Sequence, residues 1–474
     1  KKKNSYNISR EIFKKINLLS STYTSKIIIN FFSKTFEIPK DVLLIKFKKL
    51  TYNTFDYNIS KFNNKTSSLS IFTEVLRSIF LFLLIIFAKN KKKRKKYDFI
   101  IYGLTDEESF ERYEKLIRKF KSTLVTSYSQ IKKKNYGVSF SKIPKIEKIC
   151  QEAVNEKKLN ILSFFFKIFF LSIIHNFNYL YFYNLILYSI IKNFTFFNLN
   201  RGKYFMEERF YRTCSLRNFY FKKFGGKITS TPQKNIVETS ISFFIDTDIF
   251  FSLGDEKFSL KRLRNFGARI NKNIPIGSFF MEQNWYRKKK DLSKIPRNQI
   301  LITGLNPNTW LQVNDLNFKN YEFTLRQWIK DISNEYPKLN IMVKHHSNLK
   351  SNSFEEEFFK DTNVKSVIKS KSLNHSYGYM YKSDLILSFG STTVLEAISM
   401  NKQGYFIDPS NSSKCFFYNL NNLKDIRISK FKDLKRIVEN TISKKIKKKL
   451  ERKKYCLKSD RVSETVYKYF KKIN

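Results

Sequence analysis

The stretch SDLILSFGSTTVLEAISMNKQGYFIDP, Ser383 to Pro409, decides the fold of this chain. Its first part is apolar and stops at a glycine, which is typical of a buried strand followed by a tight turn. Three hydroxyl residues then stand where a helix begins, and a second apolar run, Gly404 to Ile407, follows that helix. The pattern predicts a strand, a helix and a second strand, the crossover unit of a parallel sheet.

A ligand site is expected at the turn of this unit. The first turn of a helix leaves backbone N–H groups unpaired and carries a partial positive charge, so it suits a phosphate. Glu396 lies about one turn further along, on a face that can reach the same ligand. The alternatives are that the hydroxyl residues only cap the helix and that Glu396 is a solvated helix residue. The candidate site consists of Gly390, Ser391, Thr392, Thr393 and Glu396.

The rest of the C-terminal half repeats this alternation. Strands are predicted at residues 299–303, 341–344, 364–368 and 425–429, and helices at residues 321–334, 354–360, 377–382 and 431–443. Alternating strands and helices predict a doubly wound parallel sheet, in which ligands bind beyond the carboxyl ends of the strands. That rule adds residues from three further strand ends to the candidate site: Gly304, Lys344, His345, His346, Ser376 and Tyr377.

The N-terminal half is less regular. Residues 1–97 are rich in Lys, Asn and Ser with apolar patches, and we expect an extra helical region there. Strands are predicted at residues 98–103, 124–126, 227–230, 241–245 and 248–254, with a helix at residues 106–121. A polar, charged stretch at residues 282–294 indicates a boundary. We therefore expect an N-terminal region at 1–97, a Rossmann-like domain at 98–285, and a second one at 286–474 that ends in a basic helical tail.

Length and composition indicate a packed protein with two domains. The chain has 474 residues, of which 42% are hydrophobic and 17% aromatic. A formal charge of +50 suggests nucleic acid as a partner. However, the excess lies in Lys, alongside abundant Asn, Ile, Phe and Tyr, which is the bias of AT-rich codons. Since no nucleic-acid-binding motif is present, we expect no nucleic-acid partner, and attraction to an anionic membrane surface or to nucleotides instead.

Cysteine usage indicates a reducing compartment. The four cysteines are far apart and form no CxxC pair, so free thiols are expected rather than disulfides or a metal cluster. Asp246-Thr247-Asp248 resembles a metal-binding triplet, but nothing else supports a metal there, and we expect none. No apolar core closely follows the basic N-terminal residues, so no signal peptide is expected. These features predict a cytoplasmic protein.

Two segments raise the question of a membrane. Residues 79–88 are apolar and precede the basic run KNKKKRKK at residues 89–96. This apolar run is too short to span a bilayer, but together the two suit a protein resting on the inner, anionic face of the cell membrane. Residues 168–191 contain no Lys, Arg, Asp or Glu and are long enough to span. For that segment a span, a membrane-surface helix and a buried helix pair all remain open.

On these residues, the C-terminal half resembles the nucleotide-binding domain of GT-B glycosyltransferases, and is similar to enzymes of bacterial capsule and surface-polysaccharide assembly. The resemblance rests on the opening stretch and on VKHHSN at residues 343–348. Residues 250–280 are similar to the family's strand and turn before the interdomain linker. The likeness covers residues 240–445, and residues 98–240 loosely. Ser347 stands where the family has Pro, and PQKNI at residues 232–236 stands where many relatives have Gln-His-Gly.

The resemblance implies two Rossmann-like domains, with the nucleotide-sugar donor on the second and a glycan or lipid-linked acceptor on the first. His346 matches the family's catalytic histidine, and the resemblance implies that His346 or its neighbour His345 faces the diphosphate or the leaving phosphate. It also implies that Glu396 accepts hydrogen bonds from the ribose, and that Ser376 and Tyr377 contact the base or ribose. The donor is a substrate, and no cofactor is expected. The acceptor hydroxyl needs a base from the first domain, and Asp248, near a strand end, is our candidate. The other visible carboxylates are Glu207, Glu208, Asp246 and Asp255.

Other functions remain open. A polyol-phosphate transferase that uses a CDP-alcohol shares the fold and a similar His and Ser pattern, and a nucleotide-sugar epimerase of this fold is expected to be smaller. From different classes, a non-catalytic scaffold and a nucleic-acid-binding protein are the alternatives. Salt-dependent binding to DNA or RNA, without preference for nucleotide sugars, would distinguish the last of these.

Overall fold

The computed structural model describes most of the chain. The described residues are 5–55, 68–87, 94–129, 131, 138–142, 151–175, 178–234, 244–255, 257–286, 297–304, 318–344, 357–367, 374–389, 391–409, 421–443 and 451–473.

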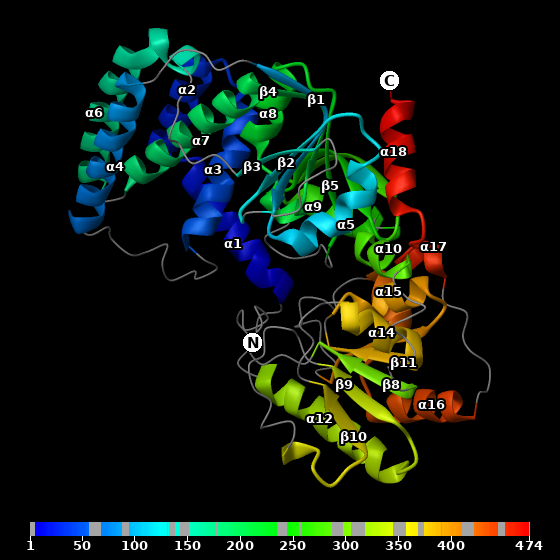
Figure 1. Ribbon diagram of the computed structural model, residues 1–474. Coiled ribbons are helices and arrows are strands. Elements are labelled where there is room, and N and C mark those ends of the chain that lie inside the picture. The colour runs from blue at the N-terminus through cyan, green and yellow to red at the C-terminus, as the bar shows by residue number, and fades with distance from the viewer. Residues whose placement is uncertain are drawn as a thin grey trace.

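Two parallel sheets form the framework, one above the other in Figure 1. In the described residues the first sheet has seven strands, in the spatial order β3 (Val138–Lys142), β2 (Thr123–Ser127), β1 (Lys95–Leu104), β4 (Asn200–Glu207), β5 (Ile228–Pro232), β6 (Asp246–Ser252) and β7 (Arg269–Pro275). The second has six, in the order β10 (Val364–Val367), β9 (Ile341–Lys344), β8 (Asn298–Thr303), β11 (Ser383–Ser388), β12 (Gln403–Ile407) and β13 (Arg427–Ile428).

Both sheets are wound in the same way. In the first, the chain moves outward from β1 to β3 and returns on the other side of β1 with β4. In the second, β8 and β11 are the corresponding neighbours. This reversal is the topological switch point at which Rossmann-like sheets bind ligands. The predicted fold class, an α/β protein with two Rossmann-like sheets and N-terminal helices, is confirmed.

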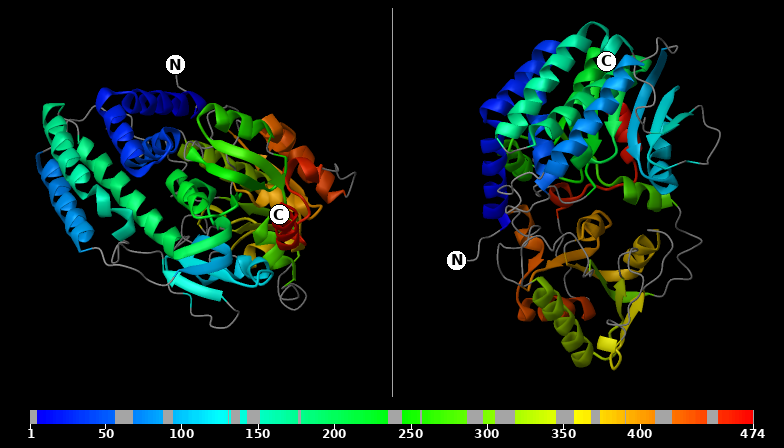
Figure 2. Two further views of the ribbon diagram at one scale, coloured as in Figure 1. Left: turned by 90° about the horizontal axis from the view of Figure 1, so that it is seen from above. Right: turned by 90° about the vertical axis from the view of Figure 1, so that its left-hand side faces the viewer.

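Helices cover both sheets and form a separate layer beside the first (Figures 1 and 2). Against the first sheet lie α5 (Glu107–Ile117), α8 (Ser215–Lys223), α9 (Lys257–Asn265) and α10 (Phe279–Tyr286). With the second lie α12 (Phe318–Glu335), α14 (Asn374–Lys382), α15 (Thr393–Ser399) and α16 (Phe431–Ile442). The separate helical layer consists of α1 (Ser5–Ser20), α2 (Tyr23–Phe36), α3 (Lys40–Phe55), α4 (Ser68–Ile86), α6 (Lys158–Ile174) and α7 (Tyr179–Leu199).

Short polar residues set several helix starts. The carboxylate of Asp106 accepts a hydrogen bond from the backbone N–H of Ser109 at 2.8 Å, and α5 begins at the next residue. Asn178 caps α7 in the same way, through the N–H of Tyr181 at 3.1 Å. Such caps satisfy N–H groups that have no partner within the helix.

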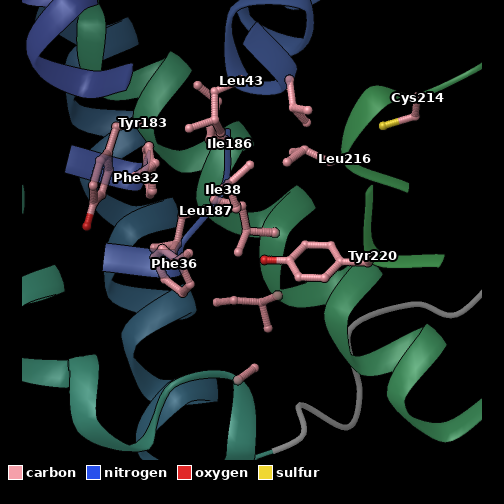
Figure 3. Close-up of a cluster of buried hydrophobic side chains, with 14 of the residues drawn as sticks. Phe32, Phe36, Ile38, Leu43, Tyr183, Ile186, Leu187, Cys214, Leu216 and Tyr220 are labelled. Carbon is pink, nitrogen blue, oxygen red and sulfur yellow. The ribbon is translucent and has the colours of Figure 1, made fainter. Parts of the chain in front are cut away.

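The helical layer has an aromatic core that is continuous with the first sheet. Figure 3 shows part of it, where Phe32 and Phe36 of α2 meet Tyr183 and Leu187 of α7. Phe32 and Tyr183 are fully buried, and their rings stack with centroids 5.5 Å apart. Helix α7 is buried along most of its length because it lies between α4, α6 and α8. The helical N-terminal region therefore packs around a helix from the middle of the chain.

In the segment 168–191, residues 179–191 belong to α7, which is buried along most of its length, whereas residues 168–174 belong to α6, which exposes Phe170, Ile173 and Ile174. A buried helix pair is therefore wrong for α6. The polar residue Asn184 of α7 has buried partners, because its amide donates to Glu74 Oε2 at 3.0 Å and accepts from Ser78 Oγ at 2.8 Å. Among the described helices, none combines the length and the apolar character needed to cross a membrane.

The C-terminal segment returns to the first sheet. Helix α17 (Arg452–Tyr455) is followed by Leu457, whose N–H donates to the carbonyl of Leu253 at 2.9 Å. Helix α18 (Val462–Lys472) then packs on the first sheet, where Phe470 stacks on Tyr204 at 4.9 Å (Figure 1). The predicted second domain, residues 286–474, includes this helix, but its buried apolar side chains pack on the first sheet. The boundary near residue 286 stays a prediction.

For most predicted strands, the observed ends lie within three residues of the predicted ends. The strand predicted at 425–429 is shortened to β13, because residues 421–426 form a 3-10 helix. Residues 244 and 245, the described part of the strand predicted at 241–245, form no strand. Three strands went unpredicted, β3, β4 and β7; the edge strand β7 carries polar and partly exposed residues, so it lacks an apolar run.

We expect Asn184→Ala to destabilise the protein by about 2–4 kcal/mol, because it leaves Glu74 and Ser78 buried without their partner. Asn193→Ala on the same helix is the matched control, since within the described residues that amide donates to the carbonyl of Ser189, one turn earlier, at 2.7 Å. The control should lose less than about 1 kcal/mol. Urea unfolding of both variants measures the difference, and equal losses would contradict this account.

Candidate functional site

The switch point of the second sheet brings the ends of β8 and β11 together. Thr303 and Ser388 are partners in the register, and Ser388 Oγ donates to the Thr303 carbonyl at 3.1 Å. Gly304 follows with φ +82°, and a Cβ there would lie 2.7 Å from the carbonyl oxygen of Phe389. Only glycine fits this conformation and this close approach. Gly304 therefore holds the two loops against each other, as a turn residue.

Three hydroxyl groups are linked across this switch point. Thr303 Oγ1 and Thr393 Oγ1 are 2.7 Å apart, and Thr393 Oγ1 donates to Ser391 Oγ at 3.1 Å. Thr392 precedes α15, but its side chain makes no capping hydrogen bond. Ser391 accepts weakly from the N–H of Thr393, at 3.4 Å. Capping therefore explains little of this cluster. Thr303 is buried, and Ser391, Thr392 and Thr393 are half-buried beside the strand ends.

Glu396 is buried rather than solvated. Its side chain lies on α15 and the residue is only 3% exposed. Oε1 accepts from Ser278 Oγ at 2.5 Å, and Oε2 accepts from the Tyr377 hydroxyl at 3.1 Å. Ser278 follows β7 of the first sheet and Tyr377 lies on α14, so the carboxylate joins both halves of the chain. The interpretation of Glu396 as a solvated helix residue is wrong.

Burial raises the pKa of Glu396 to about 7, against the hydrogen bonds of Ser278 and Tyr377 and the charge of Arg112, which lower it. Burial and the neighbouring carboxylate raise the pKa of Tyr377 well above its ordinary value. The Glu396 carboxyl therefore changes its charge near neutral pH.

The other predicted residues of the second sheet are placed only in part. Lys344, the last residue of β9, is 3% exposed, and burial lowers the pKa of its amine. Ser376 lies on α14, one residue before Tyr377, and its side chain is outside the described part. Three predicted residues fall outside the described residues: His345, His346 and Gly390.

Asp248 does not join these residues. It is the third residue of β6, near the amino end of that strand, whereas the switch points lie at carboxyl ends. One carboxylate oxygen accepts from Lys222 Nζ at 2.5 Å and the other from the Thr229 N–H at 2.9 Å. Asn271 also donates to it, at 2.9 Å. The structure thus keeps Asp248 apart from Glu396 and surrounds it with partners.

The switch point of the first sheet carries a cluster of charged side chains. Glu208 directly follows β4, and its side chain is fully buried. Its carboxylate accepts from Arg112 of α5 at 3.3 Å and from Arg209 Nε at 3.1 Å, and it also pairs with Lys234 Nζ. Lys234 lies just beyond β5, and its side chain is 8% exposed. Three cations thus surround one carboxylate; we call this set the Glu208 cluster.

Within the Glu208 cluster, the amine of Lys234 has a lowered pKa. Burial by itself would raise the pKa of Glu208, but Lys234 and Arg112 outweigh it and lower that pKa. Burial and the charge of Arg112 lower the pKa of Lys234 to about 7. Glu208 is therefore ionised at neutral pH, while Lys234 is poised between its charged and neutral forms.

The two switch points meet at the start of α10. The Arg112 guanidinium lies over the ring of Phe280, 3.6 Å from its centroid, and Lys234 Nζ lies 5.7 Å from the same ring. Phe280 is two residues after Ser278, which donates to Glu396. The charge of Arg112 also acts on Glu396 and Tyr377. Arg112 therefore belongs to the Glu208 cluster and also acts on the buried carboxylate of the second half.

Of these residues, Glu208 is among the carboxylates visible in the sequence, whereas no sequence pattern predicts Arg112, Lys234 or Ser278. In a chain with 90 Lys and Arg, a single buried cation gives no signal. The one sequence feature that points to the region of Lys234 is PQKNI at residues 232–236, which stands where many members of the GT-B family have Gln-His-Gly. Within the described residues, no group of His, Cys, Asp and Glu has the arrangement of a metal site.

Comparisons with known proteins give structural likeness alone. No protein-family model matches the chain, and no curated protein matches it by sequence. The solved structures that it resembles include the UDP-GlcNAc 2-epimerase from Neisseria meningitidis bound to UDP-GlcNAc, with a TM-score of 0.45 and 10% identity over 79% of this chain and 100% of that one. The wall teichoic acid polymerase TagF matches with a TM-score of 0.44 and 10% identity over 86% and 98%. The α,α-trehalose 6-phosphate synthase from Burkholderia multivorans matches with a TM-score of 0.39 and 8% identity, over 80% of this chain and 94% of that one.

We expect Gly304→Ala to destabilise the protein by about 2–4 kcal/mol, through strain at positive φ and through the clash with Phe389. Gly225→Ala is the control, because Gly225 has φ +88° but open space around its Cβ position. The control should lose about 1 kcal/mol, from the backbone alone. Thermal or urea unfolding measures both losses of stability. Equal losses in Gly304→Ala and Gly225→Ala would contradict the close approach of the two loops.

We expect Glu396→Gln to change how stability depends on pH. The carboxyl binds its proton more tightly when folded, with a pKa of about 7 against an ordinary 4.5, so stability is lost as pH rises between these values. The full effect is about 3 kcal/mol, since one pKa unit equals 1.36 kcal/mol. Urea unfolding measures the free energy of unfolding at pH 5 and pH 8. Between these pH values, the stability of the variant relative to the wild type should increase by up to that amount. Parallel pH profiles would contradict the raised pKa.

Proposed function

We propose that this chain is a glycosyltransferase, which moves a sugar from a nucleotide-sugar donor to a glycan or lipid-linked acceptor in surface-polysaccharide synthesis. The observation that carries the proposal is the meeting of two switch points, each with buried ionisable groups, on either side of Ser278 and Phe280. A transferase of two substrates needs two such sites side by side, because donor and acceptor must be held together for reaction.

On the donor side, we assign the phosphates to the loop before α15. The hydroxyl groups of Ser391, Thr392 and Thr393 and the backbone at Gly390 would bind them, with Lys344, His345 and His346 supplying positive charge. Glu396 and Tyr377, held together by a hydrogen bond, would bind the ribose, with Ser376 beside them. Gly304 would keep the neighbouring loop close. What supports these roles is the shared switch point and the burial of Glu396.

On the acceptor side, we assign the proton transfer to Lys234. The acceptor hydroxyl attacks the anomeric carbon, the bond between that carbon and the diphosphate oxygen breaks, and the hydroxyl proton passes to the neutral amine of Lys234. Lys234 takes the role expected of Asp248, because Asp248 lies near the amino end of β6. Arg112 and Arg209 would offset negative charge on the departing diphosphate. In support, the Glu208 cluster carries more positive than negative charge, and Arg112 Nε has no hydrogen-bond partner in the described part.

We place the enzyme at the inner face of the cell membrane, as a peripheral protein. The basic run at residues 89–96 directly follows the apolar end of α4, and exposed Arg94, Lys95 and Lys96 continue into β1. Such a run is attracted to anionic lipids, where a lipid-linked acceptor would be found.

A thermal-shift screen against UDP, GDP, CMP, CDP and TDP and their sugars tests the function. One nucleotide should raise the melting temperature by about 2–4 °C at saturating concentration. Ser391→Ala/Thr393→Ala should lose this shift. Lys234→Gln should keep it but lower sugar transfer by about a hundredfold or more, the range of general-base catalysis. Wild-type transfer should increase as pH rises through about 7, because the neutral amine is the base.

The outcomes separate the alternatives. A shift with a CDP-alcohol, and with none of the sugars, would replace sugar transfer by polyol-phosphate transfer. Inversion at the sugar without an acceptor would indicate an epimerase. A folded protein that responds to no nucleotide would overturn the proposal in favour of a scaffold, or of a nucleic-acid-binding protein if DNA or RNA binds with strong salt dependence. Full activity in Lys234→Gln would remove Lys234 from the mechanism.

A further inference from the structure

Two neighbouring helices of the helical layer expose apolar side chains to solvent. On α4 the exposed residues recur at helical spacing along one face: Phe72, Leu76, Ile79, Phe80, Leu83 and Ile86. On α6 the corresponding residues are Leu159, Leu162, Phe166, Phe170, Ile173 and Ile174. With Phe87, these are thirteen of the twenty exposed large apolar side chains among the described residues, so they are concentrated rather than scattered. We call this surface the α4–α6 face.

The two helices lie side by side at the outer edge of the molecule, away from the second sheet (Figures 1 and 2). They contact each other through the rings of Phe82 and Phe165, whose centroids are 5.4 Å apart. Their inner faces are also apolar and pack on α7. A helix that is apolar all round is normally buried, because apolar surface is unfavourable in water. The exposed side of the two helices therefore requires an apolar partner that would cover it.

Charge indicates what that neighbour is. Four charged residues occur in the two helices, and the single acidic one, Glu74, is buried and paired with Arg77 at 2.6 Å. Arg77 and Lys167 are exposed beside the apolar face, and in the sequence the run KNKKKRKK begins at residue 89, three residues after the end of α4. A second copy would bring the same positive charges together across the interface, which is unfavourable. An anionic lipid surface offers apolar chains and negative charge at once.

We propose that the α4–α6 face inserts its apolar side chains into one leaflet of an anionic bilayer, with the exposed cations Arg77 and Lys167 contacting the lipid headgroups. The two helices lie in the plane of the membrane and do not cross it. The inference stands on exposed side chains and charge, and it is independent of which reaction the switch points catalyse.

The test is co-sedimentation of the full chain with vesicles of phosphatidylcholine, alone or mixed with phosphatidylglycerol. The wild type should bind the mixed vesicles much more tightly than the neutral ones, and added salt should weaken that binding. Phe80→Ser/Phe170→Ser, one exposed ring from each helix, should lower the partition coefficient about tenfold or more, because each ring buries apolar area in the membrane. Thermal melts should show both proteins equally folded.

Phe323→Ser/Ile442→Ser is the matched control, since these residues are exposed on α12 and α16 with the second sheet. It should bind vesicles as the wild type does. The proposal is overturned if the wild type fails to bind anionic vesicles at low salt, or if Phe80→Ser/Phe170→Ser binds as tightly as the control. It is also overturned if light scattering shows a wild-type dimer that the Phe80/Phe170 variant converts to monomers, since the face would then join two copies. Loss of nucleotide response would leave this result unchanged, which separates the two proposals.

Discussion

The carboxylate of Glu396 is buried where the two halves of the chain meet, and each of its oxygens accepts a hydrogen bond from a different segment. Ser278 comes from the segment that leaves the first sheet, and Tyr377 from a helix of the second. Removing a carboxylate from water is unfavourable unless it is hydrogen-bonded, so these partners have to remain in place. The relative position of the two halves at this point is thereby coupled to one buried acid.

Around that contact, the two parallel sheets position the other residues of the candidate site. Since all strands of a sheet run the same way, their carboxyl ends lie at one edge, and the reversal of strand order opens a place for a ligand there. Gly304 and the linked hydroxyl groups occupy that edge in the second sheet, and the Glu208 cluster occupies it in the first. The C-terminal helix α18 crosses back to the first sheet, so the two halves are connected twice by the chain.

The helical layer has a different physical character. Its inside is an aromatic core that includes a hydrogen-bonded polar group, Asn184 with Glu74 and Ser78, and its outside is apolar on α4 and α6. The inner polar contact fixes how α4 packs on α7, because a buried amide without partners is costly. With α4 fixed in this way, the orientation of its exposed apolar face is fixed too.

The sequence by itself determined the alternation of strands and helices in the C-terminal half, the start of a helix just after the hydroxyl residues Ser391 and Thr392, and the helices that the structure describes between residues 5 and 86. Apolar runs that end at glycine, and helical periodicity, are local patterns that depend on nearby residues alone. Only the tertiary structure decided that Glu396 is buried, that Asp248 lies apart from it, and that Arg112 and Lys234 surround Glu208. Those features come from elements far apart in the chain, and in a sequence so rich in lysine a buried cation looks like any exposed one. Burial and its effect on charge are set by the packing of distant segments, which no local pattern encodes.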